Sequence, residues 1–180
     1  MSDTQDRGSD LLELLAADHH RLRHLVLEDT DTAVLVRELA THLVADAHLL
    51  YAEARRSVAN ADPLVDDLAD VDHLLEEALV DLDKHAGDPD VRKRVRELAA
   101  RHIDHQEDGL FPRMRDEVDR RRLVALGDAL GEVLAQAPTH AHPNLPAEGP
   151  LAIIADALAA RYDELRDAYR EGRRGKEADT

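Results

Sequence analysis

A motif that recurs along the chain limits what this sequence can fold into. Residues 42–55, HLVADAHLLYAEAR, have a relative sixty positions later in residues 102–115, HIDHQEDGLFPRMR. In each copy a histidine is followed four residues later by an oxygen-bearing side chain, Asp46 in the first copy and Gln106 in the second. Residues four apart lie on one face of an α-helix, about one turn apart. The repeat therefore predicts two related helices, each of which presents an imidazole and an oxygen atom in the same direction.

An Asp-His pair upstream of each copy extends the repeat to a helical hairpin. Asp18-His19 precedes the first copy and Asp72-His73 precedes the second. Leucines at helical spacing flank His19, so we expect His19 to point inward. In the second hairpin the leucine pattern favours Asp72 as the inward polar residue, whereas the repeat favours His73. Two hairpins of this kind form a layout for holding metal between four helices.

The composition supports a helical protein and excludes several classes of function. The chain has 180 residues, of which 43% are apolar and only 2% aromatic, so its core must consist mainly of Leu, Val and Ala. The net charge of −16 argues against nucleic acid and anionic membranes as partners, because phosphate groups would be repelled. The sequence lacks an apolar run long enough for a membrane-spanning helix and its N-terminus is polar, so we expect a cytoplasmic protein. The absence of cysteine excludes disulfides and thiolate ligands.

Turn signals along the chain predict its organisation. We expect a disordered N-terminus over residues 1–9, a metal-binding helical bundle over 10–136, and a proline-rich segment with a last helix and tail over 137–180. Asp62-Pro63 and Asp88-Pro89 each place a helix cap before a proline, which suits the first position of a helix. A further helix is expected over residues 115–136. The prediction is an all-α fold, an antiparallel four-helix bundle with additional C-terminal helices.

At the repeated residues the chain resembles the hemerythrin-like family, the HHE cation-binding domain. The lone histidines of the family match at His19 and His73, and its His-x3-acid pair matches at His42 and Asp46, with Asp where Glu is usual. The fourth-helix motif before Leu-Phe-Pro matches over residues 102–112. The similarity extends over residues 10–136, and the proline-rich segment and the DELRDA ending look like those of actinobacterial members.

The resemblance implies a non-haem centre of two irons, with an oxo bridge as an option and manganese or zinc as alternative metals. Gln106 stands where a bridging Glu is expected, and a neutral amide bridges metals poorly, so Glu107 is the nearest substitute. The roles of Tyr51, Glu77 and His105 stay open: Tyr51 either packs or ligates, and the other two could complete the coordination. The expected ligands are His19, His42, Asp46, His73, His102 and Glu107.

Three functions are alternatives at this stage. The leading one is a hemerythrin-like diiron protein that binds or processes dioxygen, hydrogen peroxide or nitric oxide, with oxidoreductase-type turnover left open. The second is a non-catalytic protein that binds or senses iron, because the loss of a bridging carboxylate favours labile binding. The third is a degenerate member that acts as a helical interaction scaffold. The sequence leaves the oligomeric state open.

Overall fold

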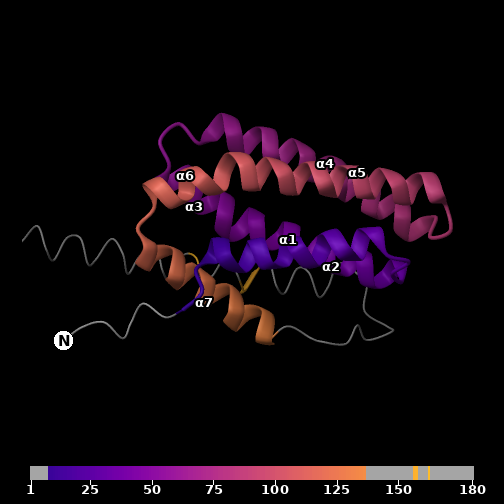
Figure 1. Ribbon diagram of the computed structural model, residues 1–180, viewed down its shortest axis with the longest axis horizontal. Helices are drawn as coiled ribbons and strands as arrows, with labels where there is room; N and C mark the ends of the chain where they lie inside the picture. Colours follow the sequence, from indigo (N-terminus) through magenta and orange to yellow (C-terminus); the bar gives the residue numbers. More distant parts are fainter. Residues whose placement is uncertain (1–7, 137–155, 158–161, 163–180) are drawn as a thin grey trace, which may run out of the picture.

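The computed structural model describes residues 8–136, 156–157 and 162, and every regular element in that part of the chain is helical (Figure 1). The all-α prediction is confirmed. The predictions for residues 1–7 and for nearly all of 137–180 lie outside the described residues. In chain order the elements are α1 (Leu11–Leu27), α2 (Thr32–Ala45), η1 (Asp46–Leu50), α3 (Tyr51–Ser57), α4 (Asp62–Lys84), α5 (Pro89–His105), η2 (Gln106–Leu110), α6 (Phe111–Glu117) and α7 (Arg120–Gln136).

Aspartates at the helix starts fix where the long helices begin. Asp10 forms a capping box with Glu13: its side chain accepts from the Glu13 N–H at 2.9 Å, and its own N–H donates to Glu13 Oε2 at 3.1 Å. Asp31 and Asp88 cap α2 and α5 in the expected way, by accepting backbone N–H groups of the first turn. The sequence predicted Asp62 as the cap of α4, and this prediction was wrong. Asp62 is itself the first helical residue, because the residue before it already has helical dihedral angles.

Two π-helical segments interrupt the helices at equivalent places of the repeat. The α2–η1–α3 run and the α5–η2–α6 run each contain a π-helical segment directly after an α-helix, beginning at Asp46 and Gln106. In each, a backbone N–H bonds five residues back, from Tyr51 to Asp46 and from Phe111 to Gln106. Such turns are rare and occur frequently at functional sites. Ordinary helical periodicity does not reveal them: the sequence predicts an unbroken helix to about Val58 in the first run, and in the second only a helix end perturbed by Gly109 and Pro112.

The four long helices α1, α2, α4 and α5 enclose a common interior. Both α1 and α4 contact α2 and α5, so the contacts close into a ring, and α7 packs on α1 (Figure 1). Gly127 allows the close approach of α7, because a Cβ there would lie 2.6 Å from the carbonyl oxygen of Ser9. The predicted helix over 115–136 is divided at Val118, whose backbone is extended. Within the described part of the chain, no helix has the length and apolarity needed to cross a bilayer.

The interior consists of two apolar clusters with a polar layer between them. Leu15 and Leu68 belong to one cluster, and Leu22 and Leu75 belong to the other. His19 lies between the two leucines of α1, and Asp72 lies between the two leucines of α4; both are buried. An unpaired buried polar group costs roughly 2–7 kcal/mol, so the members of the layer must satisfy one another. The buried polar residues of this layer are His19, His42, Asp46, Asp72, His102 and Gln106.

Candidate metal centre

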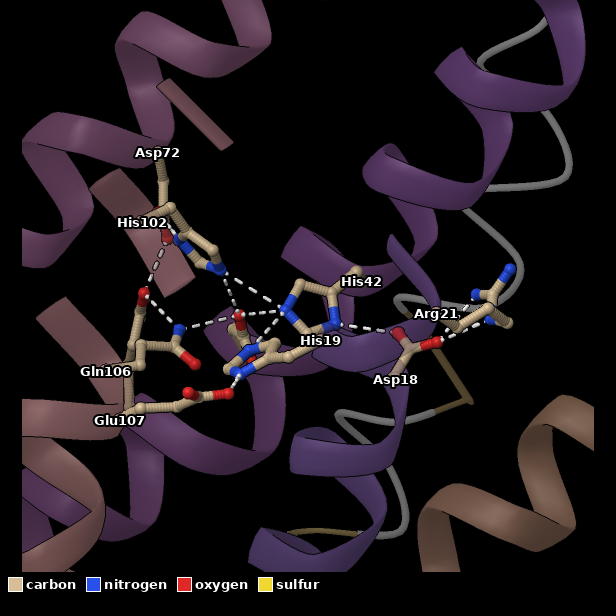
Figure 2. A network of polar contacts seen from close by, with 10 residues as sticks. Asp18, His19, Arg21, His42, Asp72, His102, Gln106 and Glu107 are labelled. Carbon is tan, nitrogen blue, oxygen red and sulfur yellow. Dashed lines mark hydrogen bonds and ion pairs between the residues drawn. The ribbon is translucent and has the colours of Figure 1, made fainter. Parts of the chain in front are cut away.

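Three imidazoles from three helices converge on one buried point. His19 of α1, His42 of α2 and His102 of α5 turn their Nε2 atoms toward one another, with His42 Nε2 at 3.1 Å from that of His19 and 3.2 Å from that of His102 (Figure 2). All three side chains are buried. Metal–nitrogen bonds of about 2.0–2.1 Å in a tetrahedral site put the nitrogens about 3.3–3.4 Å apart, close to this spacing. The buried group could therefore hold a metal ion.

Asp46 supplies an oxygen donor beside two of these nitrogens. Its Oδ2 lies 3.2 Å from His42 Nε2 and 3.2 Å from His102 Nε2, and its side chain is fully buried. The position of Asp46 at the start of η1, four residues after His42, places the two side chains on one face. Together the four side chains form a set of three nitrogen donors and one carboxylate, as in many transition-metal sites.

A carboxylate fixes the outer nitrogen of each imidazole. Nδ1 of His19 lies 2.9 Å from Glu107 Oε1, Nδ1 of His42 lies 2.8 Å from Asp18 Oδ2, and Nδ1 of His102 lies 2.5 Å from Asp72 Oδ1. An ionised carboxylate only accepts hydrogen bonds, so each Nδ1 carries a proton and each ring turns its Nε2 inward, where a neutral ring offers a lone pair. Three lone pairs and one carboxylate at one point require either protons or a metal cation between them.

The ionisation of the metal-free centre shows how the negative charge of Asp46 is balanced. Burial opposes protonation of His42, but Asp46 and Asp18 outweigh it and raise the pKa of His42 to about 10. Burial, together with the positive charge on His42, lowers the pKa of His19 to about 4. Burial would raise the pKa of Asp46, but His42 and His102 hold it well below its usual range. At neutral pH a proton on His42 therefore occupies the place that a metal cation would take.

The three outer carboxylates differ in their access to solvent. The side chains of Asp18 and Glu107 are 28% and 30% exposed, whereas that of Asp72 is 11% exposed. Arg21 donates to Asp18 at 2.6 Å, and Arg23 donates to Glu107 at 3.0 Å. Asp72 has no such arginine among the described contacts and lies inside the helical ring. The His102–Asp72 pair is thus the least screened of the three.

Gln106 and Tyr51 connect Asp46 to Asp72 inside the polar layer. The Gln106 amide nitrogen donates to Asp46 Oδ2 at 2.7 Å and to the Tyr51 oxygen at 3.0 Å. The Tyr51 hydroxyl in turn donates to Asp72 Oδ2 at 2.7 Å. Burial and the charges of Asp46 and Asp72 raise the pKa of Tyr51, so its hydroxyl stays protonated. Tyr51 therefore acts here as a hydrogen-bond donor and not as a phenolate ligand.

Four of the six predicted ligands come together at the centre: His19, His42, Asp46 and His102. Glu107 is adjacent but contacts the outer nitrogen of His19, so it supports that imidazole and does not point to the cluster of Nε2 atoms. His73 is not brought to the site, because its side chain is 71% exposed and pairs with Glu76 and Glu77 on the surface.

A shift of one residue between the two hairpins explains the position of His73. The buried stripe of α1 contains Leu15, His19 and Leu22, and the same spacing in α4 gives Leu68, Asp72 and Leu75. Asp72 therefore occupies the inward position that corresponds to His19, and the next residue points about 100° away around the helix. The prediction of an inward His73 from the repeat was wrong, and the leucine pattern that favoured Asp72 was the better signal.

Glu77 and His105 do not complete the coordination. Both lie on the surface, and Glu77 pairs with His73 and Arg94. The positions of His105 three residues after His102 and of Glu77 four after His73 put them at helical spacing from expected ligands. Helical spacing from an expected ligand was insufficient evidence. His73, the reference for Glu77, itself faces solvent, and His105 lies on the surface although His102 is buried.

The sequence patterns did not identify Asp18 and Asp72 as partners of the histidines. Each belongs to an Asp-His pair, and each bonds the outer nitrogen of the His-x3 histidine in its own hairpin: Asp18 that of His42, and Asp72 that of His102. The recurring Asp-His pair is visible in the sequence, but its histidine is the more obvious ligand type. The structure assigns the shared role to the aspartate.

Comparison with known proteins finds no match to this chain among family models, curated proteins or solved structures. The functional interpretation therefore depends on the residues of the centre and on their geometry. The likeness to the hemerythrin-like family remains a resemblance of spaced motifs.

Proposed function

We propose that this chain binds one transition-metal ion, in the first instance iron, through His19, His42, His102 and Asp46. The observation that carries the proposal is the set of three Nδ1–carboxylate contacts, which direct three Nε2 atoms to a single buried point. Imidazole and carboxylate donors suit iron, manganese and zinc. The ring of α1, α2, α4 and α5 fits a hemerythrin-like four-helix bundle, a common host for such centres.

The centre of two irons that the resemblance implies does not fit these donors. His73, which would serve a second ion, points into solvent. Gln106, at the place of a bridging carboxylate, is neutral and uses its amide nitrogen as a donor. The remaining convergent donors are enough for one ion.

We further propose that the centre meets a small oxidant, namely dioxygen, hydrogen peroxide or nitric oxide. A bound iron ion would supply a redox-active position at which such a molecule can bind. The chain's own contribution is enclosure and orientation. Leu15 and Leu22 belong to the apolar clusters on either side of the layer, and Phe111 stacks on the His19 ring at a centroid distance of 5.4 Å. These groups keep bulk water from the histidines and hold His19 in place.

A non-catalytic role in iron binding or sensing is the second candidate, because the centre joins all four long helices. Its donors come from four elements, α1, α2, η1 and α5. The remaining long helix, α4, contacts the centre through the hydrogen bond of Asp72 with His102. An ion that binds only the folded chain stabilises it increasingly as the ion concentration rises above its dissociation constant. Iron would then control the stability of the whole helical ring without any turnover.

Metal analysis of the full chain, loaded anaerobically with ferrous iron, tests both candidates. We expect about one iron per chain, none in a His102→Ala variant, and changes in absorption when nitric oxide or peroxide is added. Consumption of peroxide faster than by free iron supports the oxidant role. A rise in melting temperature with iron but no reaction supports sensing, and the absence of bound iron, manganese or zinc overturns the proposal.

A further inference from the structure

We infer that Gln106 limits this centre to one metal ion and that a carboxylate at position 106 would admit a second. The inference rests on the proposed function and concerns the polar residues beside the three histidines. It assigns to Gln106 a role in determining how many ions the protein holds.

The Gln106 amide nitrogen takes the place of a cation in a row of oxygen atoms. Its two N–H bonds point to Asp46 Oδ2 and to the Tyr51 oxygen, and the Tyr51 hydroxyl continues to Asp72 (Figure 2 shows Gln106 and Asp72 close to His102). All four side chains are buried. Each N–H neutralises, through its partial positive charge, an oxygen that would otherwise attract a metal ion.

The hydrogen-bond pattern fixes the orientation of the amide. The Gln106 nitrogen lies 2.7 Å from Asp46 Oδ2. A reversed amide would place the Gln106 oxygen at a similar distance from that carboxylate, where two acceptors repel each other. In the present orientation Gln106 Oε1 and Asp46 Oδ1 are buried without a hydrogen-bond partner in the described structure. Unsatisfied buried acceptors are unusual and favour a donor or a cation nearby, so one carboxylate oxygen remains available beside the centre.

Replacement of Gln106 by Glu would change only the charge and the donor capacity of this position. The side chain keeps its length and shape, but two carboxylates would then face each other across the present hydrogen-bond distance, and a shared proton or a cation must relieve their repulsion. A divalent cation relieves that repulsion. The oxygen atoms around it would come from position 106, Asp46, Asp72 and Tyr51, and such a set suits ferrous iron or Mn²⁺.

Counting bound ions by native mass spectrometry during an anaerobic titration with ferrous iron tests the inference. We expect the wild-type chain to reach a plateau at one ion even in excess iron, and the Gln106→Glu variant to reach two. Gln106→Met is the matched control, because methionine has a similar length but neither the amide donors nor a charge. It should stay at one ion, which separates the gain of a carboxylate from the loss of the amide.

Each outcome of the titration decides a separate point. A wild-type chain with two ions, or a Gln106→Met variant with two, would overturn the inference. Gln106→Asp, with a shorter carboxylate, is the second variant in case Gln106→Glu does not fold without iron. For both variants the bound ions are counted in the iron-loaded protein. One ion in the carboxylate variants also overturns the inference, whereas no ion in the wild type contradicts the proposed function itself.

Discussion

The two helical hairpins, α1 with α2 and α4 with α5, carry related motifs but contribute unequally to the centre. The first hairpin and its π-helical extension supply three converging donors, His19, His42 and Asp46. The second supplies one, His102, together with the supporting residues Asp72 and Gln106. A sequence repeat therefore identified where the polar layer lies, but the role of each position within that layer depends on the face of the helix that is buried.

What the hairpins share is a contact between two of their own residues. Asp18 holds His42 in the first hairpin, and Asp72 holds His102 in the second. The contact fixes the ring orientation and keeps the outer nitrogen protonated, which leaves the inner nitrogen free for a metal. The unequal part is the lone histidine, because His19 lies on the buried stripe and His73 lies beside it.

Removal of a histidine should show the largest difference between the hairpins. His19→Ala removes one of four donors, and we expect the affinity for ferrous iron to fall by more than the roughly 10–100-fold typical of a supporting residue. His73→Ala should leave the affinity unchanged, because the side chain is exposed. Competition with a chromogenic chelator measures both constants. Equal losses in the two variants would contradict the placement of His73 outside the centre.

Removal of the supporting aspartates should have the next largest effect. Asp72→Asn and Asp18→Asn each weaken the hold on one imidazole, and we expect losses of affinity of about 10–100-fold. The side chain of Asp72 is 11% exposed and that of Asp18 is 28% exposed. The loss should therefore be greater for Asp72, because screening by water and salt is weaker there. Equal or reversed losses in the same competition assay would show that solvent access does not distinguish the two hairpins.

The pH dependence of iron binding should reveal the proton held by the first hairpin. In the metal-free protein the pKa of His42 is raised to about 10, so the residue is protonated at pH 7 and must release that proton to bind a metal. We expect the affinity to rise by at least about tenfold per pH unit from about pH 7 to pH 9, because His42 releases its proton and the pKa of His102 is raised as well. The raised pKa also means that the metal-free fold loses stability as the pH rises toward 10.

Titrations at several pH values measure this slope of affinity against pH. They are performed below the pH at which iron hydroxide forms, or with Zn²⁺ in place of iron. Urea unfolding of the metal-free protein over the same range measures the stability. An affinity that is independent of pH would mean that His42 is neutral in the metal-free protein, in conflict with its contacts to Asp46 and Asp18.

The smallest effect is expected at Tyr51, which corresponds to Phe111 in the repeat. Tyr51→Phe removes a hydrogen bond from Asp72 and leaves one N–H of Gln106 unpaired. The loss should lower the free energy of unfolding by about 1–2 kcal/mol, as measured by urea unfolding. Iron should still bind, with only a modest loss of affinity. Complete loss of iron in Tyr51→Phe would show that Tyr51 is a ligand and would contradict its protonated state.

The sequence predicted the helical class, the aspartate cap of α5, and the inward direction of His19, His42 and Asp46. These features follow from local periodicity and capping chemistry, which a single sequence contains. The outward direction of His73 depended on choosing the leucine stripe over the repeat. The contacts of Asp18 with His42 and of Glu107 with His19 join different helices, and no local pattern reports the relative rotation of two helices. The sequence also did not predict the π-helical segments, because one extra residue in a turn changes the spacing of apolar residues very little.

The most direct test of the central claim is a crystal structure of the iron-loaded chain with anomalous scattering recorded at the iron absorption edge. We predict a single anomalous peak per chain among the three histidines His19, His42 and His102. It should lie about 2.0–2.2 Å from their Nε2 atoms and from a carboxylate oxygen of Asp46. A peak ligated by His73, two peaks in the wild-type chain, or no peak at the three histidines would contradict the claim.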